Sequence, residues 1–120
     1  MSVKIDLRRF PRVPVERPVY VTTPAEGMRG RTLLSHELGE GGCLLIGDDF
    51  FGTGRILLLD IVLDAKRPAR AIGKVLYEYR SLNGNVCSGV AFDYVEDEHL
   101  RRLKDYIFDR TPMQAEVGVA

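Results

Sequence analysis

"AIGKVLYEYRSLNGNVCSGVAFDY" (residues 71–94) carries the strongest local folding signal in the chain. Its first half alternates with a period of two, and the residues expected to face a core are Ala71, Gly73, Val75, Tyr77 and Tyr79. The second half resumes this period at Val86, Ser88, Val90, Phe92 and Tyr94. Between them, Asn83 and Gly84 favour a tight type I′ turn, because both central positions of that turn need positive φ. The stretch therefore predicts a β-hairpin.

The spacing of the apolar residues changes immediately after this hairpin. Between Glu96 and Arg110, Leu100, Leu103 and Ile107 recur at helical spacing, and the first turn is acidic. This pattern predicts one amphipathic helix. The Thr111-Pro112 pair should end it, so residues 111–120 are expected to form a disordered tail.

Short segments of β character precede the hairpin. Turn-rich pieces separate them, and the segments are Val19–Thr23, Gly30–Leu38, Gly42–Gly47 and Ile56–Leu63. Many strands followed by one helix favour a mainly β domain over residues 18–110, an antiparallel barrel with a C-terminal α-helix packed at its end or side. Residues 1–17 contain Pro11 and Pro14 and run up to Pro18, which predicts a flexible, extended N-terminal arm.

The charge balance and the lack of long apolar runs argue against several classes of protein. The 120 residues include 17 basic and 17 acidic ones, so a general nucleic-acid-binding surface is not expected. The longest nearly apolar run, residues 56–63, is too short to span a bilayer and contains Asp60. The first residues lack the apolar stretch of a signal peptide. We therefore expect a cytoplasmic protein that binds neither nucleic acid nor membrane.

Chemistry-bearing side chains are sparse. Cys43 and Cys87 lack a CxxC spacing and lie in apolar segments, so they are expected to be buried, reduced thiols. His36 and His99 match no metal-ligand spacing. No nucleophile is paired with a base, so the sequence predicts no enzyme, no metal site and no cofactor.

Two stretches could bind an anion. Arg8, Arg9 and Arg12 concentrate guanidinium groups in the arm, and such groups match phosphate oxygens and the O6 and N7 atoms of guanine. A solvated basic terminus is the alternative interpretation. In "HELGEGGCLL" (residues 36–45), three glycines either turn the chain or offer backbone amides to an anion.

Together these stretches carry a family resemblance. The RxxxR pattern from Arg8 to Arg12, the turn at residues 37–42, "GRILLLDIVL" (54–63), "GKVLYEY" (73–79), "GVAFDYV" (89–95) and the closing helix resemble the PilZ domain family over about residues 7–110. The resemblance implies a six-stranded antiparallel β-barrel of the split-barrel type with a C-terminal helix. It also implies a receptor for the bacterial second messenger cyclic di-GMP, acting in motility or biofilm regulation.

The resemblance also implies a set of ligand-binding residues. These are Arg8, Arg9, Arg12, Glu37, Gly39, Gly41 and Gly42. The family usually has Asp or Asn where this chain has Glu37, and Ser where it has Gly39. Loss of the serine hydroxyl removes one hydrogen bond, worth about 1 kcal/mol, so weaker binding is expected.

Two functions follow from this resemblance. In the first, cyclic di-GMP binding changes the conformation of the arm, and the domain signals to an unidentified downstream protein. The alternative is a PilZ-fold protein-interaction domain, related to pili or motility, that does not bind the nucleotide. In either case the expected state is a monomer or weak homodimer.

Overall fold

The computed structural model describes residues 12–64 and 67–111. The strands are β1 (Arg12–Pro14), β2 (Pro18–Thr23), β3 (Arg29–Gly39), β4 (Gly42–Gly47), β5 (Ile56–Ile61), β6 (Ala69–Arg80) and β7 (Val86–Tyr94). The helices are the short 3-10 helix η1 (Pro24–Glu26) and α2 (Asp97–Arg110). The predicted strands and the C-terminal helix are all present, with ends that differ by at most two residues from the expected ones.

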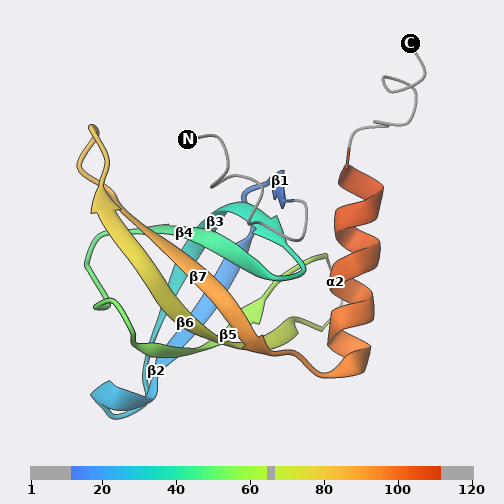
Figure 1. Ribbon diagram of the computed structural model, residues 1–120, viewed down its shortest axis with the longest axis horizontal. Helices are drawn as coiled ribbons and strands as arrows, with labels where there is room; N and C mark the ends of the chain where they lie inside the picture. Colours follow the sequence, from blue (N-terminus) through green and yellow to red (C-terminus); the bar gives the residue numbers. More distant parts are fainter. Residues whose placement is uncertain (1–11, 65–66, 112–120) are drawn as a thin grey trace.

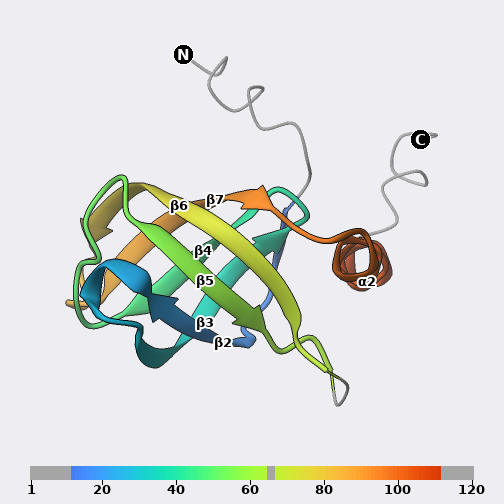
Figure 2. The same cartoon turned by 90° about the horizontal axis from the view of Figure 1, so that it is seen from below.

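The strands close into a barrel (Figure 1). All pairings are antiparallel, in the order β3-β2-β5-β6-β7-β4, and β4 returns to pair with β3. The short β1 pairs with the end of β3 beyond the reach of β2. The six-stranded barrel expected from the sequence is therefore confirmed, and β1 is an added seventh strand. Figure 2 shows α2 beside the barrel.

Alternating side chains from the strands fill the barrel. The fully buried apolar residues of β2 and β5 are Val19, Val21, Leu57, Leu59 and Ile61. Helix α2 adds Leu103, Tyr106 and Ile107, which are buried at helical spacing along one of its faces. Burying a Leu or Val side chain is worth about 1.5–3 kcal/mol, so this interior supplies most of the driving force for folding.

The turn of the predicted hairpin differs from the expected type. The Gly84 N–H donates to the Ser81 carbonyl and the Ser81 N–H donates to the Asn85 carbonyl, so the loop holds three residues. Gly84 has a φ of 94°, but Asn83 is not in the positive-φ region. The type I′ prediction is therefore wrong. The three-residue loop ends instead on a left-handed glycine, the next most common hairpin arrangement.

A β-bulge in β6 overturns part of the predicted core. The pairing of β6 with β7 shifts between Val75 and Tyr77, which leaves Leu76 as an extra residue. One extra residue transfers every later side chain to the other face. Tyr77 and Tyr79 therefore lie outside the barrel, 44% and 48% exposed, and Glu78 turns inward.

Tyr94 is a second error in the predicted core. It is 58% exposed, whereas Phe92 packs partly buried against the core. Tyr94 pairs with Ile72 and Phe92 pairs with Gly73, so the register of β6 and β7 shifts a second time between these two pairs. The strict alternation therefore fails at both irregular positions of the hairpin.

The segment that leads into the barrel is held by several contacts. The Ser35 hydroxyl donates to the Val15 carbonyl at 2.6 Å and accepts from the Arg17 N–H at 2.9 Å. The Arg17 Nε donates to the Val62 carbonyl at 2.8 Å, and Val13 is buried. Residues 12–17 of the expected arm thus pack on the barrel, and residues 1–11 lie outside the described residues, as does all but Thr111 of the expected tail.

Both cysteines are free and buried, as the sequence predicts. Burial raises the pKa of Cys43 to about 12, and the nearby Arg12 guanidinium opposes part of that rise. Among the described residues, no group of His, Cys, Asp and Glu side chains could hold a metal ion. Within the same ranges, none of the helices has the length and apolar character needed to cross a membrane.

Candidate functional site

The β1–β3 pairing brings Arg12 to the glycine turn. Arg12 pairs with Gly39, and its side chain is only 15% exposed. Its Nη1 lies 3.6 Å from Glu37 Oε1, which is an ion-pair distance but too long for a hydrogen bond. Nη1 is buried and has no hydrogen-bond partner among the described residues. This nitrogen therefore has a donor that no residue of the described ranges uses.

Gly42 provides the space for this guanidinium. A Cβ on Gly42 would lie 2.3 Å from the Val90 carbonyl oxygen and 3.4 Å from Arg12 Nη2. The neighbouring Gly41 carbonyl accepts from the Phe92 N–H at 2.9 Å, so the turn is tied to β7. Any larger residue at position 42 would push apart β4 and β7. The glycine thus serves both barrel packing and the close approach of Arg12.

A bulge in β3 turns Glu37 toward Arg12. The β3–β4 register shifts between Ser35 and Glu37, and His36 is the extra residue. Ser35 points into the barrel and is fully buried, whereas Glu37 opposes Leu44 on the outer face. Without the bulge, residues two apart would share a face. The carboxylate therefore reaches the site because of this irregularity.

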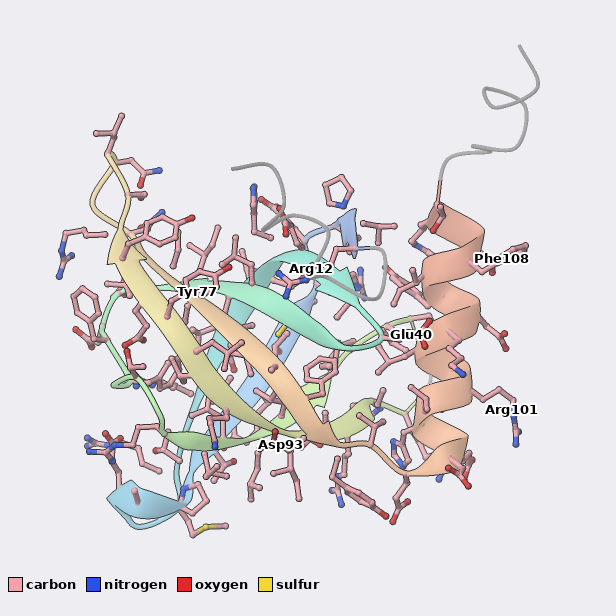
Figure 3. The ribbon with its side chains drawn as sticks, viewed as in Figure 1. Arg12, Glu40, Tyr77, Asp93, Arg101 and Phe108 are labelled. Atoms are coloured by element: carbon pink, nitrogen blue, oxygen red, sulfur yellow. The ribbon has the colours of Figure 1, made fainter. Side chains whose placement is uncertain are left out.

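An outward-facing row of residues extends from Glu37 across three more strands. Leu44 opposes Glu37 and Gly89, and Gly89 opposes Tyr77. A Cβ on Gly89 would lie 2.2 Å from Cζ of Tyr77, so the tyrosine ring lies flat over the glycine. Figure 3 shows Arg12 and Tyr77 on the same side of the barrel. The row therefore links the Arg12–Glu37 ion pair to an aromatic surface.

A second tyrosine enlarges this aromatic surface. The rings of Tyr77 and Tyr79 are stacked, with centroids 6.3 Å apart and planes 10° from parallel. Tyr79 lies beside Cys87, and a hydrogen bond with that thiol, together with burial, raises the pKa of the Tyr79 hydroxyl. Planar apolar faces of this kind stack on nucleotide bases.

The five described residues of the predicted site all lie at or beside the β3–β4 turn. Arg12, Glu37 and Gly42 are close to one another, Gly39 pairs with Arg12, and Gly41 anchors the turn. Arg8 and Arg9 lie outside the described residues.

Sequence reasoning missed Tyr77 and Tyr79, because strict alternation assigned them to the core. An available signal was Gly89, since an isolated glycine inside a strand often marks a close approach by another group.

The family model of the PilZ domain matches residues 6–109. The chain belongs to the PilZ domain family. The matched range includes β1, the whole barrel and nearly all of α2. No curated protein sequence matches the chain.

Solved structures of PilZ proteins share this fold. The Bacillus subtilis inhibitor of motility MotI/DgrA matches with a TM-score of 0.75 and 16% identity, over 86% of this chain and 50% of that one. The PilZ domain of YcgR from Escherichia coli with c-di-GMP matches with a TM-score of 0.67 and 12% identity, over 92% and 96% of the two chains. The MrkH–c-di-GMP complex from K. pneumonia matches with a TM-score of 0.68 and 15% identity, over 85% and 51%. The chain thus spans about half the length of MotI/DgrA and MrkH.

Proposed function

We propose that this PilZ domain is a receptor for cyclic di-GMP, which binds on the outer face of β3, β4, β7 and the end of β6. The observation that carries the proposal is the buried donor of Arg12, beside Glu37 and Gly42, which has no partner in the part of the chain that the structure describes. A buried donor without a partner costs about 1–3 kcal/mol, and a phosphate or guanine oxygen would satisfy it.

Each part of the site has a role in this proposal. Arg12, with Arg8 and Arg9 from the preceding segment, binds phosphate and the guanine edge. The Glu37 carboxylate accepts hydrogen bonds from guanine N1 and N2, and Gly39, Gly41 and Gly42 allow the nucleotide to approach the backbone. A guanine base stacks on Tyr77 and Tyr79. These roles require binding alone, so the proposal includes no catalysis, metal or cofactor.

Signalling follows when nucleotide binding changes the conformation of the segment that carries Arg8 and Arg9. The complex then presents a surface, made of both the nucleotide and the segment, to a downstream protein. Similarity to a structure whose name includes an inhibitor of motility favours a partner in motility control. We place this signalling in the cytoplasm, as the sequence predicts. Partner binding would therefore depend on the nucleotide.

Calorimetric titration of the purified chain with cyclic di-GMP tests the proposal. Arg12→Ala should weaken binding by about 2 kcal/mol, or about 30-fold, because charge-assisted hydrogen bonds are lost. Arg101→Ala is the matched control, since that arginine points away from the barrel on the outer side of α2 (Figure 3). Absence of heat from the unmodified chain at about 1 mM nucleotide would refute the proposal.

The alternative function is a PilZ-fold interaction domain that does not bind the nucleotide. The observation in its favour is the Arg12–Glu37 ion pair, which already partly neutralises the guanidinium. The Gly39 position also lacks the hydroxyl typical of the family. This alternative predicts that titration of the unmodified chain and of Arg12→Ala gives the same absence of heat.

A further inference from the structure

The outer face of β2, β5 and β6, with the end of β7, carries a second cluster of apolar side chains. It lies on the side of the barrel seen in Figure 2, where β5 and β6 are in front and α2 is to one side. The apolar residues that point outward from these strands are Tyr20, Ile56, Leu58, Ile72 and Tyr94. All except the half-buried Leu58 are 37–58% exposed. Exposed apolar side chains that gather on one face are typical of an interaction site.

The cross-strand register arranges two rows of this face in complementary pairs. On β5 and β6, Leu58 lies directly opposite Ile72, and in the next row Asp60 lies opposite Arg70. The Arg70 Nε donates to Asp60 Oδ1 at 3.0 Å, while the Arg70 side chain remains 77% exposed. An apolar pair therefore lies beside an acid–base pair, with one member of each pair on each strand.

We propose that this face binds a second copy of the chain and forms a symmetric dimer. Consider a twofold axis that runs parallel to the strands, in front of the face and midway between β5 and β6. It would place Leu58 against Ile72 of the second copy and Asp60 against Arg70 of the second copy, each contact occurring twice. A symmetric interface requires a self-complementary patch, and these pairs supply one.

The neighbouring strands fit the same symmetry. Thr22 on β2 and Tyr94 on β7 continue the row of Leu58 and Ile72 on its two sides. The axis brings each Thr22 opposite Tyr94 of the second copy, which pairs a small side chain with a large one. This face also contains a hollow of about 750 Å³, lined in part by Leu58, Ile72 and Tyr94. Side chains of the second copy can enter this hollow.

Charge also argues for a second copy as the occupant. Facing copies would form a ring of four alternating charges, two Asp60 and two Arg70, in which each arginine contacts a carboxylate of its own chain and one of the other. A partner with one sign of charge would meet a like charge at this row, which is unfavourable. The dimer does not depend on nucleotide binding, because its contacts lie away from Arg12 and Tyr77.

Charge reversal gives a direct test by sedimentation equilibrium. Asp60→Lys makes the row wholly basic and Arg70→Glu makes it wholly acidic, so each variant alone should dimerise at least about 10-fold more weakly than the unmodified chain. An equimolar mixture should recover dimers, because the introduced lysine then faces the introduced glutamate, and the Arg70 kept by one variant faces the Asp60 kept by the other. Both variants lack the ion pair within their own chain, so this recovery can come only from contact between copies.

Apolar variants supply the second arm of the test. Ile72→Glu should yield monomers, whereas Phe108→Glu, on the exposed side of α2, should leave dimerisation unchanged. Circular dichroism checks that each variant is folded. The proposal is overturned if the unmodified chain stays monomeric at about 0.5 mM, a concentration that populates weak complexes. It is also overturned if the mixed charge variants fail to associate.

Discussion

Glu78 should contribute more to stability than the exposed carboxylates of the chain. The bulge at Leu76 turns it inward, where its carboxylate accepts three hydrogen bonds. The donors are the Phe51 N–H at 2.8 Å, the Gly52 N–H at 2.9 Å and the Ser88 hydroxyl at 2.7 Å. These bonds tie the loop after β4 to the β6–β7 hairpin that carries the candidate aromatic surface.

The cost of Glu78→Ala follows from these contacts. Hydrogen bonds to a charged group are each worth about 1.5–3 kcal/mol, but the three share one carboxylate and are not additive. We expect a loss of about 3 kcal/mol in the free energy of unfolding, or a decrease in Tm of about 12 °C for a chain of this size. Glu78→Gln keeps one acceptor oxygen, so its loss should be about half as large.

Urea unfolding followed by circular dichroism measures this loss. Glu98→Ala is the matched control, because the Glu98 carboxylate makes an exposed ion pair with Arg67 at 3.0 Å. Such a pair contributes at most about 1 kcal/mol. If Glu78→Ala destabilises the protein no more than Glu98→Ala does, the inward-facing network does not stabilise the loop and the reasoning fails.

Two further predictions concern Cys43 and Gly89. Burial raises the pKa of Cys43 from 9.0 to about 12, so the unfolded chain loses this proton first and stability should fall as pH rises through the interval from 9 to 12. At pH 10 the shifted thiol pKa lowers the free energy of unfolding by about 1.4 kcal/mol. The decrease in the free energy of unfolding between pH 7 and pH 10 should therefore be smaller by that amount in Cys43→Ala. Equal decreases in the two proteins would contradict this prediction. Gly89→Ala should displace the Tyr77 ring, reduce the near-ultraviolet tyrosine signal and weaken cyclic di-GMP binding severalfold, because the added Cβ would lie 2.2 Å from the ring. An unchanged tyrosine signal would show that the ring does not rest on the glycine.

Local patterns in the sequence were sufficient for the order of the six barrel strands and α2. The period of two over residues 71–94 predicted the hairpin, and the change to helical spacing after Glu96 predicted α2. The motifs at Arg12 and residues 37–42 indicated the family, which the family model confirms. These signals are short-range, because each depends on residues within a few positions of one another.

Tertiary structure decided which side chains face outward. Two single-residue bulges, at His36 and at Leu76, reversed the alternation, bringing Glu37 to Arg12 and placing Tyr77 outside the barrel. A bulge depends on how one strand fits its neighbour, and nothing in the bulged strand alone specifies that fit.

The self-complementary face could not be predicted from the sequence either. Asp60 and Arg70, and Leu58 and Ile72, are ten or more residues apart, and only the β5–β6 register makes them direct neighbours. The sequence by itself therefore determined the six barrel strands, the C-terminal helix and the family of this protein. The pairing of strands determined its surfaces, because residues distant in the chain become neighbours only when the barrel closes.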